Sequence, residues 1–317
     1  MKDLLRIADL SPDDLVHLLR SGDAVRHDPH QHRSMLRGDT VVLYFAKPST
    51  RTRLSFASAV TRLGGVPQVV GPSELQLGRG ETIEDTARVV SRFARAFVIR
   101  TFADDDVARF ARAATIPVVN ALTDGHHPCQ ALADLLTLHR WFGRLSGLRL
   151  AYVGDGNNVA HSLLEACALS GINVAVASPP GYEPDPVVVA TAERLAGASG
   201  SEVMVANDPQ LAVRGANAVY TDVWVSMGDS EAERVARLEA LRPYRVDEAL
   251  MALADRDAVF MHCLPAHRGE EVAAKVIDGP RSVVFDQAEN RMHTAQALLQ
   301  ALLLGELVGA RQRAGVH

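Results

Sequence analysis

The segment Ser49–Arg53 reads Ser-Thr-Arg-Thr-Arg and places hydroxyl groups and two guanidinium groups side by side, between an apolar run and a helical pattern. Amides at a helix N-terminus attract anions, and arginine can hold a phosphate through two parallel hydrogen bonds. The segment therefore indicates a phosphate site, although a helix cap followed by solvated arginines would read the same way. It lacks the GxxxxGK(S/T) pattern, so a nucleoside triphosphate is not implied.

A second polar turn, Gly154–Asn158, reads Gly-Asp-Gly-Asn-Asn and also lies between an apolar run and a helical pattern. It resembles the start of a dinucleotide-binding fingerprint, but Val159 replaces the third glycine of GxGxxG, so NAD binding is only weakly supported. The amide groups of Asn157 and Asn158 suit a small polar ligand. The alternative is a glycine-rich turn in which an asparagine caps the following helix.

Two segments carry histidines, HHPCQ with His127 and Gln130, and HCLPAH with His262, Cys263 and His267. Beside an anion site a histidine can donate to a developing oxyanion, whereas alone His127 would be an ordinary loop residue. One thiol and two imidazoles suggest metal ligands. However, successive strand residues point to opposite faces, so His262 and Cys263 are not expected to reach one ion. We expect no metal and a role in substrate contact.

The segment Asp222–Gly228 reads DVWVSMG and offers a carboxylate at a predicted strand end, with the Ser226 hydroxyl further along the loop. Such a pair suits an amino acid: Asp222 would face an ammonium group, while Ser226 and nearby backbone amides would face a carboxylate. The alternative is a capping aspartate followed by a polar loop.

These segments depend on alternating β and α elements. Strands are expected at 41–45, 97–99 and 118–119, then from 148 and at 174–177, 203–205, 218–221, 259–261 and 283–285, with helices at 54–63, from 83, and at 131–141, 159–169 and 289–307. Such βα units form parallel sheets that are covered on both faces. The sequence predicts an α/β fold of two doubly wound parallel-sheet domains with a cleft between them. Because ligands bind beyond the carboxyl ends of parallel strands, the polar segments are expected to share one site.

The composition is that of a packed globular protein, with 317 residues, 47% hydrophobic and 22% charged. This length suits two domains of about 150 residues each. The net charge of −5, without a long run of like charge, argues against a nucleic-acid partner. The three cysteines form no CxxC pair, which argues against a disulfide framework. The first residues lack the apolar run of a secretory signal, and no stretch suits a membrane span, so we expect a cytoplasmic protein.

Taken in order, several segments resemble the ornithine carbamoyltransferases of the aspartate/ornithine carbamoyltransferase family, over nearly the whole chain. They are FAKPSTRTR, QLGRGETIEDTAR, HHPCQALADLLT, GDGNNVAHS, DVWVSMG, HCLPAHRGEE and AENRMHTAQALL. STRTR and HPxQ are shared with aspartate carbamoyltransferases and indicate carbamoyl phosphate, whereas DxWxSMG and HCLP are typical of the ornithine branch. The resemblance implies carbamoyl transfer from carbamoyl phosphate to L-ornithine, giving L-citrulline and phosphate, with no cofactor.

The resemblance assigns residues 1–143, joined by the C-terminal helix 289–317, to carbamoyl phosphate and residues 148–288 to ornithine. The expected carbamoyl-phosphate contacts are Ser49, Thr50, Arg51, Thr52, Gln76, Arg100, His127, Gln130, Leu264 and Arg291. The expected ornithine contacts are Asn158, Asp222, Ser226, Met227 and Cys263. Of these, Arg100, His127, Cys263 and Arg291 are expected to act in catalysis.

The resemblance also implies a homotrimer in which Gln76 reaches the phosphate site of the neighbouring subunit. Glycines and a proline bracket the loop 71–80, which holds few apolar residues, so we expect it to extend away from its own core. Pro48 departs from the family, where this position is commonly basic or polar. Pro48 restricts Lys47 to an extended conformation, so the role of Lys47 stays open.

Three other functions can be compared with the sequence. A non-enzymatic anion-binding or regulatory module would leave the polar motifs at five strand ends unexplained. The other two are compatible with parts of the sequence. One is a carbamoyltransferase for another amine, such as acetylornithine or putrescine, against which the SMG of DVWVSMG argues by its resemblance to the ornithine branch. The other is a nicotinamide-dependent dehydrogenase built on the turn Gly154–Asn158.

Overall fold

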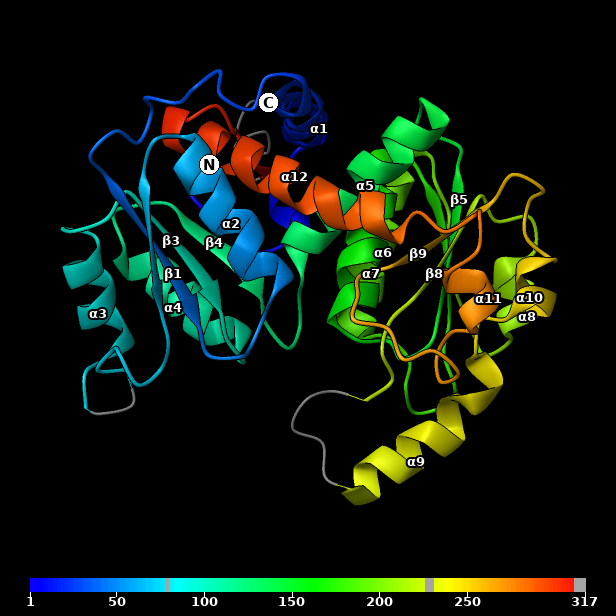
Figure 1. Ribbon diagram of the computed structural model, residues 1–317. Coiled ribbons are helices and arrows are strands. Elements are labelled where there is room, and N and C mark those ends of the chain that lie inside the picture. The colour runs from blue at the N-terminus through cyan, green and yellow to red at the C-terminus, as the bar shows by residue number, and fades with distance from the viewer. Residues whose placement is uncertain (78–79, 226–230, 311–317) are drawn as a thin grey trace. The chain divides into compact units, whose positions relative to one another are not determined.

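The computed structural model describes residues 1–77, 80–225 and 231–310. The chain forms two compact units, and each is an α/β domain built on a parallel sheet (Figure 1). Unit 1 comprises Met1–Leu136 and Glu289–His317, and unit 2 comprises Thr137–Ala288. The boundaries fall inside two helices, α5 (Pro128–Phe142) and α12 (Val284–Leu304). No helix of the described part is both long and apolar enough to cross a membrane.

The sheet of unit 1 has the order β2-β1-β3-β4, with all strands parallel. Its strands are β1 (Thr40–Phe45), β2 (Val66–Val70), β3 (Ala96–Arg100) and β4 (Val118–Leu122). The central strand β3 and the strand β4 are apolar almost throughout and buried on both faces, as expected for strands covered by helices on each side. Phe97 of β3 stacks on Phe110 at 4.1 Å between ring centroids, which joins the sheet to a covering helix.

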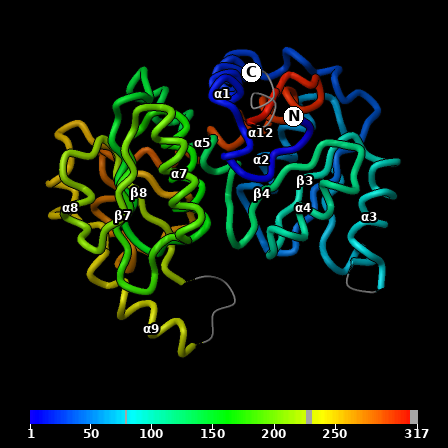
Figure 2. Tube along the Cα trace, turned by 180° about the vertical axis from the view of Figure 1, so that it is seen from behind, coloured from blue at the N-terminus to red at the C-terminus, as the bar shows by residue number. Residues whose placement is uncertain are grey.

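The covering elements of unit 1 begin where local sequence provides a cap. They are the 3-10 turn η1 (Ile7–Asp9) and helices α1 (Pro12–His27), α2 (Arg51–Arg62), α3 (Ile83–Val90) and α4 (Asp104–Ala113), with parts of α5 and α12. Ser11 and Asp14 form a capping box around the start of α1, and Thr82 caps α3. The N-terminus lies beside the segment that follows α12, where the Met1 amino group donates to the Leu307 carbonyl (Figure 2).

Unit 2 holds a parallel sheet with the order β7-β6-β5-β8-β9. Its strands are β5 (Arg149–Val153), β6 (Asn173–Ala177), β7 (Val203–Ala206), β8 (Ala218–Thr221) and β9 (Val259–His262). Its other elements are α6 (Asn158–Ser170), α7 (Pro186–Ser199), α8 (Pro209–Val213), α9 (Glu231–Leu241), η2 (Arg242–Tyr244), α10 (Glu248–Met251) and α11 (Ala274–Ile277). Asparagine or aspartate side chains cap α6, α7, α8 and α10.

Each sheet has one point at which the chain order reverses. In unit 1 it lies between β1 and β3, and in unit 2 between β5 and β8. Helices leaving adjacent strands there go to opposite faces, which opens a crevice at the carboxyl edge of the sheet. The polar segments after β1 and β5, and those after β3 and β8, therefore lie at the positions where such folds bind ligands.

Three sequence-based assignments need correction. The predicted strand at 283–285 is absent from the sheet: Ser282 makes only an isolated bridge with Phe260, and α12 already begins at Val284. The apolar run that suggested a strand is the first turn of this helix, because short apolar runs do not distinguish the two structures. The final helix consequently begins before residue 289. Strand β2 was not predicted, since its VPQVV sequence contains a proline.

The turn after α2 requires glycine at position 64. Gly64 has φ of +85°, and a Cβ atom there would lie 2.1 Å from the Arg33 carbonyl oxygen. We expect Gly64→Ala to lower the free energy of unfolding by about 2 kcal/mol or more, from backbone strain and the clash together. Gly38 has φ of +84° with no atom within 4 Å, so Gly38→Ala should cost only about 1 kcal/mol. Urea unfolding would measure both, and equal losses would show that the contact with Arg33 is unimportant.

Candidate functional site

The turn at the start of α2 carries the residues predicted to bind a phosphate. It follows β1 directly, and the Ser49 hydroxyl accepts a hydrogen bond from the Thr52 amide at 3.3 Å. Thr50, the N-cap residue, makes no side-chain capping bond. Arg51 is partly buried and Arg53 is exposed. The solvated-arginine interpretation thus fits Arg53, whereas the partly buried Arg51 stays a candidate for phosphate together with the amides at the helix start.

Arg291 links three of the predicted site residues within unit 1. Its guanidinium group donates to the Gln130 side-chain oxygen at 2.5 Å and to the Thr52 hydroxyl at 2.9 Å, and only 3% of the residue is exposed. Gln130 in turn donates from its amide nitrogen to Asp134 at 2.8 Å, which fixes the orientation of the amide group. The structure therefore brings Thr52, Gln130 and Arg291 together, although they lie far apart in the sequence.

His127 lies at the centre of the positive charge of unit 1. Burial holds the pKa of His127 well below its usual value, and the positive charges of Arg291, Arg100 and Arg51 lower it further. The imidazole is therefore neutral at physiological pH and keeps one N–H group as a hydrogen-bond donor. Close by, burial raises the pKa of the Cys129 thiol to about 12, so this cysteine is not a nucleophile.

In unit 2, Asp222 follows β8 and collects hydrogen bonds from two other segments. Its carboxylate accepts from the Asn157 amide at 2.9 Å, from the Cys263 thiol at 2.9 Å and from the Val223 amide at 2.8 Å. Only 7% of Asp222 is exposed. The structure thus joins Asp222 and Cys263, both predicted to bind the amino acid, at the carboxyl edge of the second sheet.

Asn157 is a functional candidate that the sequence did not separate from its neighbour. Its side-chain oxygen accepts from the Val159 and Ala160 amides, which makes it the cap of α6, while its amide nitrogen reaches Asp222. Asn158 is the first residue of the helix. The sequence indicated that an asparagine caps this helix. It did not indicate that Asn157 contacts the Asp222 carboxylate, which lies sixty-five residues away.

The turn Gly154–Asn158 does not match a dinucleotide site. A Cβ atom on Gly156 would lie 2.3 Å from the Pro184 nitrogen, so the chain's own backbone fills the space beside this glycine. In a dinucleotide fingerprint the second glycine leaves that approach to the pyrophosphate. Asp155 instead accepts a hydrogen bond from Arg237 at 2.7 Å. The geometry of this turn and the absence of the third glycine of GxGxxG both argue against a dinucleotide site.

The prediction that His262 and Cys263 point apart is wrong. Donor atoms of Asp222, His262 and Cys263 all lie within 4.8 Å of one another. Strand β9 ends at His262, so strand alternation does not extend to Cys263, and Leu264 then turns with φ of 57°. The His262 Nδ1 atom accepts from the Leu264 amide at 2.8 Å, and its Nε2 atom lies 3.3 Å from Glu271. Both imidazole nitrogens thus face groups of the protein.

Comparison with known proteins agrees with this arrangement of two sites on two sheets. Residues 2–140 match the aspartate/ornithine carbamoyltransferase carbamoyl-P binding domain, and residues 146–302 match the Asp/Orn binding domain of the same family. The chain belongs to the aspartate/ornithine carbamoyltransferase family. Its sequence is 54% identical over 295 residues to the ornithine carbamoyltransferase of Acidothermus cellulolyticus, covering 93% of this chain and 94% of that protein.

Further relatives of this carbamoyltransferase family cover the chain equally well. The ornithine carbamoyltransferase of Parafrankia sp. is 55% identical over 308 residues, covering 96% of this chain and 97% of that protein. The solved structure of the ornithine carbamoyltransferase from Pyrococcus furiosus has a TM-score of 0.91 and 48% identity, and covers 96% of this chain and 97% of its own. The fold and both sheets are therefore those of the family.

Two of the predicted ornithine contacts, Ser226 and Met227, lie outside the described residues. Gln76 is described and exposed, but the two residues beside it pack on the core of unit 1, which the low apolar content of the loop did not suggest. Leu75 and Leu77, on either side of it, pack against the buried cluster around Phe97. Leu75 and Leu77 therefore anchor this part of the loop to unit 1, whereas Gln76 between them is exposed. That the loop reaches a neighbouring subunit stays a prediction.

The depressed pKa of His127 predicts how this carbamoyltransferase responds to acid. Below about pH 6.5 the unfolded chain binds a proton at this position while the folded chain does not, so stability falls as pH falls. This residue should contribute up to about 1.4 kcal/mol of lost stability per pH unit below that value. His127→Gln should remove this contribution, measured by urea unfolding at about pH 7.5 and about pH 5.5. His27→Gln, at a side chain that is 72% exposed, is the control. Identical pH dependence in wild type and His127→Gln would contradict the buried neutral imidazole.

Proposed function

We propose that this protein transfers the carbamoyl group of carbamoyl phosphate to the side-chain amine of L-ornithine, giving L-citrulline and phosphate. The observation that carries the proposal is the pairing of opposite charge environments at the two topological switch points. Unit 1 gathers guanidinium groups around a neutral imidazole, whereas unit 2 presents a carboxylate with a thiol. A dianionic acyl phosphate suits the first, and an amino acid suits the second.

In unit 1 the proposed ligand is carbamoyl phosphate. The amides and hydroxyls of residues 49–52, with the Arg51 guanidinium, would hold the phosphate at the start of α2. Arg100, at the end of β3, and neutral His127 would donate hydrogen bonds to the carbamoyl carbonyl oxygen. Gln130 and Arg291 would orient the carbamoyl amide, since their mutual hydrogen bond already fixes both side chains.

In unit 2 the proposed ligand is L-ornithine. Asp222 would face its α-ammonium group, with Asn157 and Asn158 beside it at the start of α6. Cys263, bonded to Asp222, would lie near the side-chain amine. Ser226 and Met227 would complete recognition of the α-amino and α-carboxylate groups, as the family resemblance implies.

The chemistry follows from the flow of charge. The neutral amine nitrogen of ornithine forms a bond to the carbamoyl carbon, and negative charge grows on the carbonyl oxygen. The bond from this carbon to the phosphate oxygen then breaks, and the leaving phosphate can accept the amine proton. Each donor fixed at the carbonyl oxygen is worth about 3–4 kcal/mol of transition-state stabilisation. Alignment of two bound substrates removes a further large entropic barrier.

A citrulline assay with a panel of amines tests the function directly. The protein should convert carbamoyl phosphate and L-ornithine to citrulline and phosphate in equal amounts, with little turnover of acetylornithine, putrescine or aspartate. A preference for any of these other amines would overturn the assignment of ornithine while leaving carbamoyl transfer in place. The three cysteines form no disulfide, which suits the reducing compartment in which we place this enzyme, the cytoplasm. Its proposed substrate ornithine and product citrulline place it in arginine metabolism.

Because each unit is proposed to bind one substrate, two substitutions should impair the use of different substrates. Arg51→Ala should lower kcat/KM for carbamoyl phosphate by at least about tenfold, because a charge-assisted contact to a dianion is lost. Asp222→Asn should mainly raise the KM for ornithine and leave the affinity for carbamoyl phosphate alone intact. Steady-state kinetics and calorimetry would separate the two effects. A loss of carbamoyl-phosphate affinity in Asp222→Asn, with the ornithine KM unchanged, would refute the assignment of unit 2.

Matched controls exist for both substitutions. Arg53→Ala removes an exposed guanidinium group from the same turn, and it should change the kinetics far less than Arg51→Ala. Asp185→Asn neutralises an aspartate that caps α7, where asparagine caps equally well, so unit 2 should keep its stability and its ornithine KM.

We further propose that the active protein is a homotrimer in which Gln76 serves the phosphate site of a neighbouring subunit. Gln76 is exposed on a loop that Leu75 and Leu77 anchor, so a partner would meet it in a defined position. Unit 1 also exposes apolar side chains on α2 and on the edge strand β2, where Leu54 is 61% and Val66 is 56% exposed. Such residues suit a subunit interface.

Hybrid trimers would reveal a shared site. Arg51→Ala and Gln76→Glu chains are each expected to be nearly inactive alone. After unfolding together and refolding at equal ratio, about a quarter of the sites should combine an intact Arg51 with a neighbour's intact Gln76. Activity should therefore recover to about that fraction of wild type. Differently tagged chains would confirm that hybrids form. Activity at the mean of the two pure variants, in proven hybrids, would place the site within one chain.

A further inference from the structure

Three loops leave the carboxyl edge of the unit 1 sheet beside one another. They follow β1, β3 and β4, and each adjoins a predicted site residue: the first leads to Ser49, the second begins after Arg100, and the third ends at His127. Main-chain hydrogen bonds continue past the strand ends, from Ala46 to the Arg100 carbonyl at 2.8 Å and from Asp124 to the Phe102 carbonyl at 2.7 Å. The last loop, residues 123–127, ends at His127. The conformation of this loop therefore determines the position of the His127 imidazole.

Lys47 connects the first loop to the other two. Its ammonium group contacts the Asp124 carboxylate and lies 4.3 Å from the centroid of the Phe102 ring. Lys47 is separated only by Pro48 from the anion-binding turn at Ser49. The side chain of Asp124 is 61% exposed, so this ion pair alone is a weak restraint. The cation–π contact with Phe102 adds a second point of attachment.

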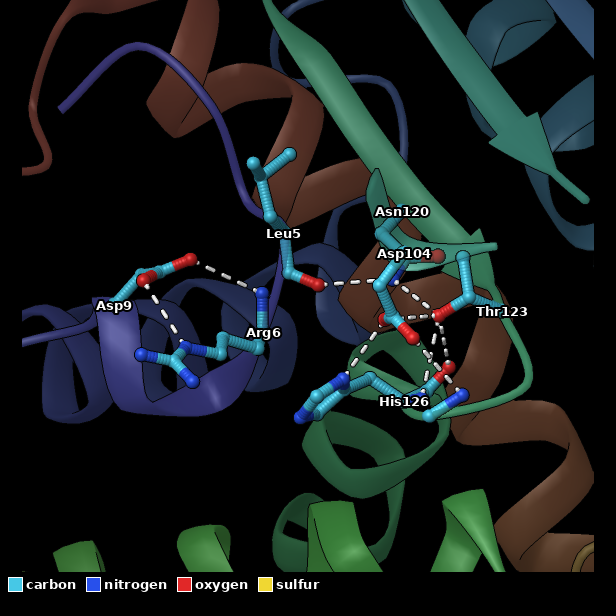
Figure 3. A network of polar contacts seen from close by, with 8 residues as sticks. Leu5, Arg6, Asp9, Asp104, Asn120, Thr123 and His126 are labelled. Atoms are coloured by element: carbon cyan, nitrogen blue, oxygen red, sulfur yellow. Dashed lines mark hydrogen bonds and ion pairs between the residues drawn. The ribbon is translucent and has the colours of Figure 1, made fainter. Parts of the chain in front are cut away.

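Asp104 holds the third loop more firmly. One carboxylate oxygen accepts from the Thr123 hydroxyl at 2.6 Å and from His126 Nδ1 at 2.8 Å, and the other accepts from the Gly125 amide at 3.1 Å (Figure 3). The Thr123 hydroxyl has one proton, which the shorter contact assigns to Asp104. Its oxygen can then accept from Asn120 at 3.1 Å and from the His126 amide at 3.3 Å. Every residue from 123 to 126 except Asp124 is thereby bonded to Asp104.

Position and charge both favour this role for Asp104. It is the first residue of α4, where the helix N-terminus stabilises a carboxylate. Burial would raise the pKa of Asp104, but hydrogen bonds from His126, Thr123 and Gly125 and the charge of His126 outweigh burial and lower it. Gly125 is matched to the contact, because a Cβ atom there would lie 2.3 Å from the Asp104 carboxylate.

We propose that Asp104, with Lys47 and Asp124, is a positioning device that fixes the loop 123–127 and so sets His127 relative to the anion-binding turn. These residues contact neither of the proposed substrates; they act through the backbone that carries His127 and through the residues before Ser49. The kinetic consequence rests on the proposed function, because it assumes that His127 contacts the carbamoyl oxygen. The structural consequence is independent of it. This also gives Lys47, beside the unusual Pro48, a role.

Asp104→Ala is the most direct test. A displacement of a reacting contact by about 1 Å can cost about a hundredfold in rate, so kcat/KM for carbamoyl phosphate should fall between about tenfold and a hundredfold. The KM for ornithine should stay within about twofold of wild type, because unit 2 is untouched. Lys47→Met should act in the same direction but more weakly, and Lys47→Arg should restore most of the loss, since arginine keeps the charge and stacks on Phe102.

The matched control is Asp105→Ala, which removes the same charge from the same turn of α4 at a side chain that is 74% exposed. The second readout is the nitrogen-15 NMR signal of the His127 imidazole, which reports its environment without any substrate. It should move in Asp104→Ala and stay in Asp105→Ala. Should Asp104→Ala fail to fold, Gly125→Ala displaces the carboxylate while keeping its charge, and it should give the same two changes.

The outcomes separate this inference from the proposed function. If Asp104→Ala or its substitute matches Asp105→Ala in both the kinetics and the His127 signal, the positioning role is overturned. If the His127 signal moves while the wild-type protein forms no citrulline, the positioning role stands and the proposed function fails. If the signal moves and citrulline formation falls as expected, both are supported.

Discussion

The concentration of guanidinium groups around one buried imidazole is the constraint on which unit 1 depends. Removing an arginine side chain from water costs several kcal/mol unless its donors are satisfied, and Arg291 is almost fully buried. The hydrogen-bonded series Asp134, Gln130, Arg291 and Thr52 uses two of those donors and ties α5, α12 and α2 together. The same charges keep His127 neutral. A site with this excess of positive charge is complete only when an anion is bound, which is why it suits carbamoyl phosphate.

Unit 2 also places charged and polar groups at the switch point of a parallel sheet, but the charge there is negative. The carboxylate of Asp222 stands at the switch point, and its hydrogen bonds come from a helix cap, Asn157, and from a thiol, Cys263. These neutral donors orient the carboxylate without cancelling its charge, so it remains able to bind an ammonium group. One fold thus serves two ligands of opposite charge, because the chemistry lies in the loops and not in the strands.

The sequence predicted what depends on local pattern and missed what depends on distant contact. The alternation of apolar runs with helical spacing gave every central strand, and the order of polar segments gave the switch-point residues. It could not show that Asn157 is the asparagine that reaches Asp222, because their contact spans the chain from one strand end to another. Strand alternation failed at Cys263, since the strand had already ended. The sequence also could not show which groups contact Lys47, because Asp124 and Phe102 approach it only after three loops have folded.

We propose above all that the positive charge of unit 1 holds carbamoyl phosphate with its carbonyl oxygen at His127. A crystal structure of the protein with carbamoyl phosphate bound would test this most directly. We expect the phosphate oxygens to contact the amides of residues 49–52 and Arg51, with the carbonyl oxygen within hydrogen-bond distance of Arg100 and His127. Phosphate bound instead at the turn Gly154–Asn158 of unit 2, with the Arg51 turn unoccupied, would contradict this proposal.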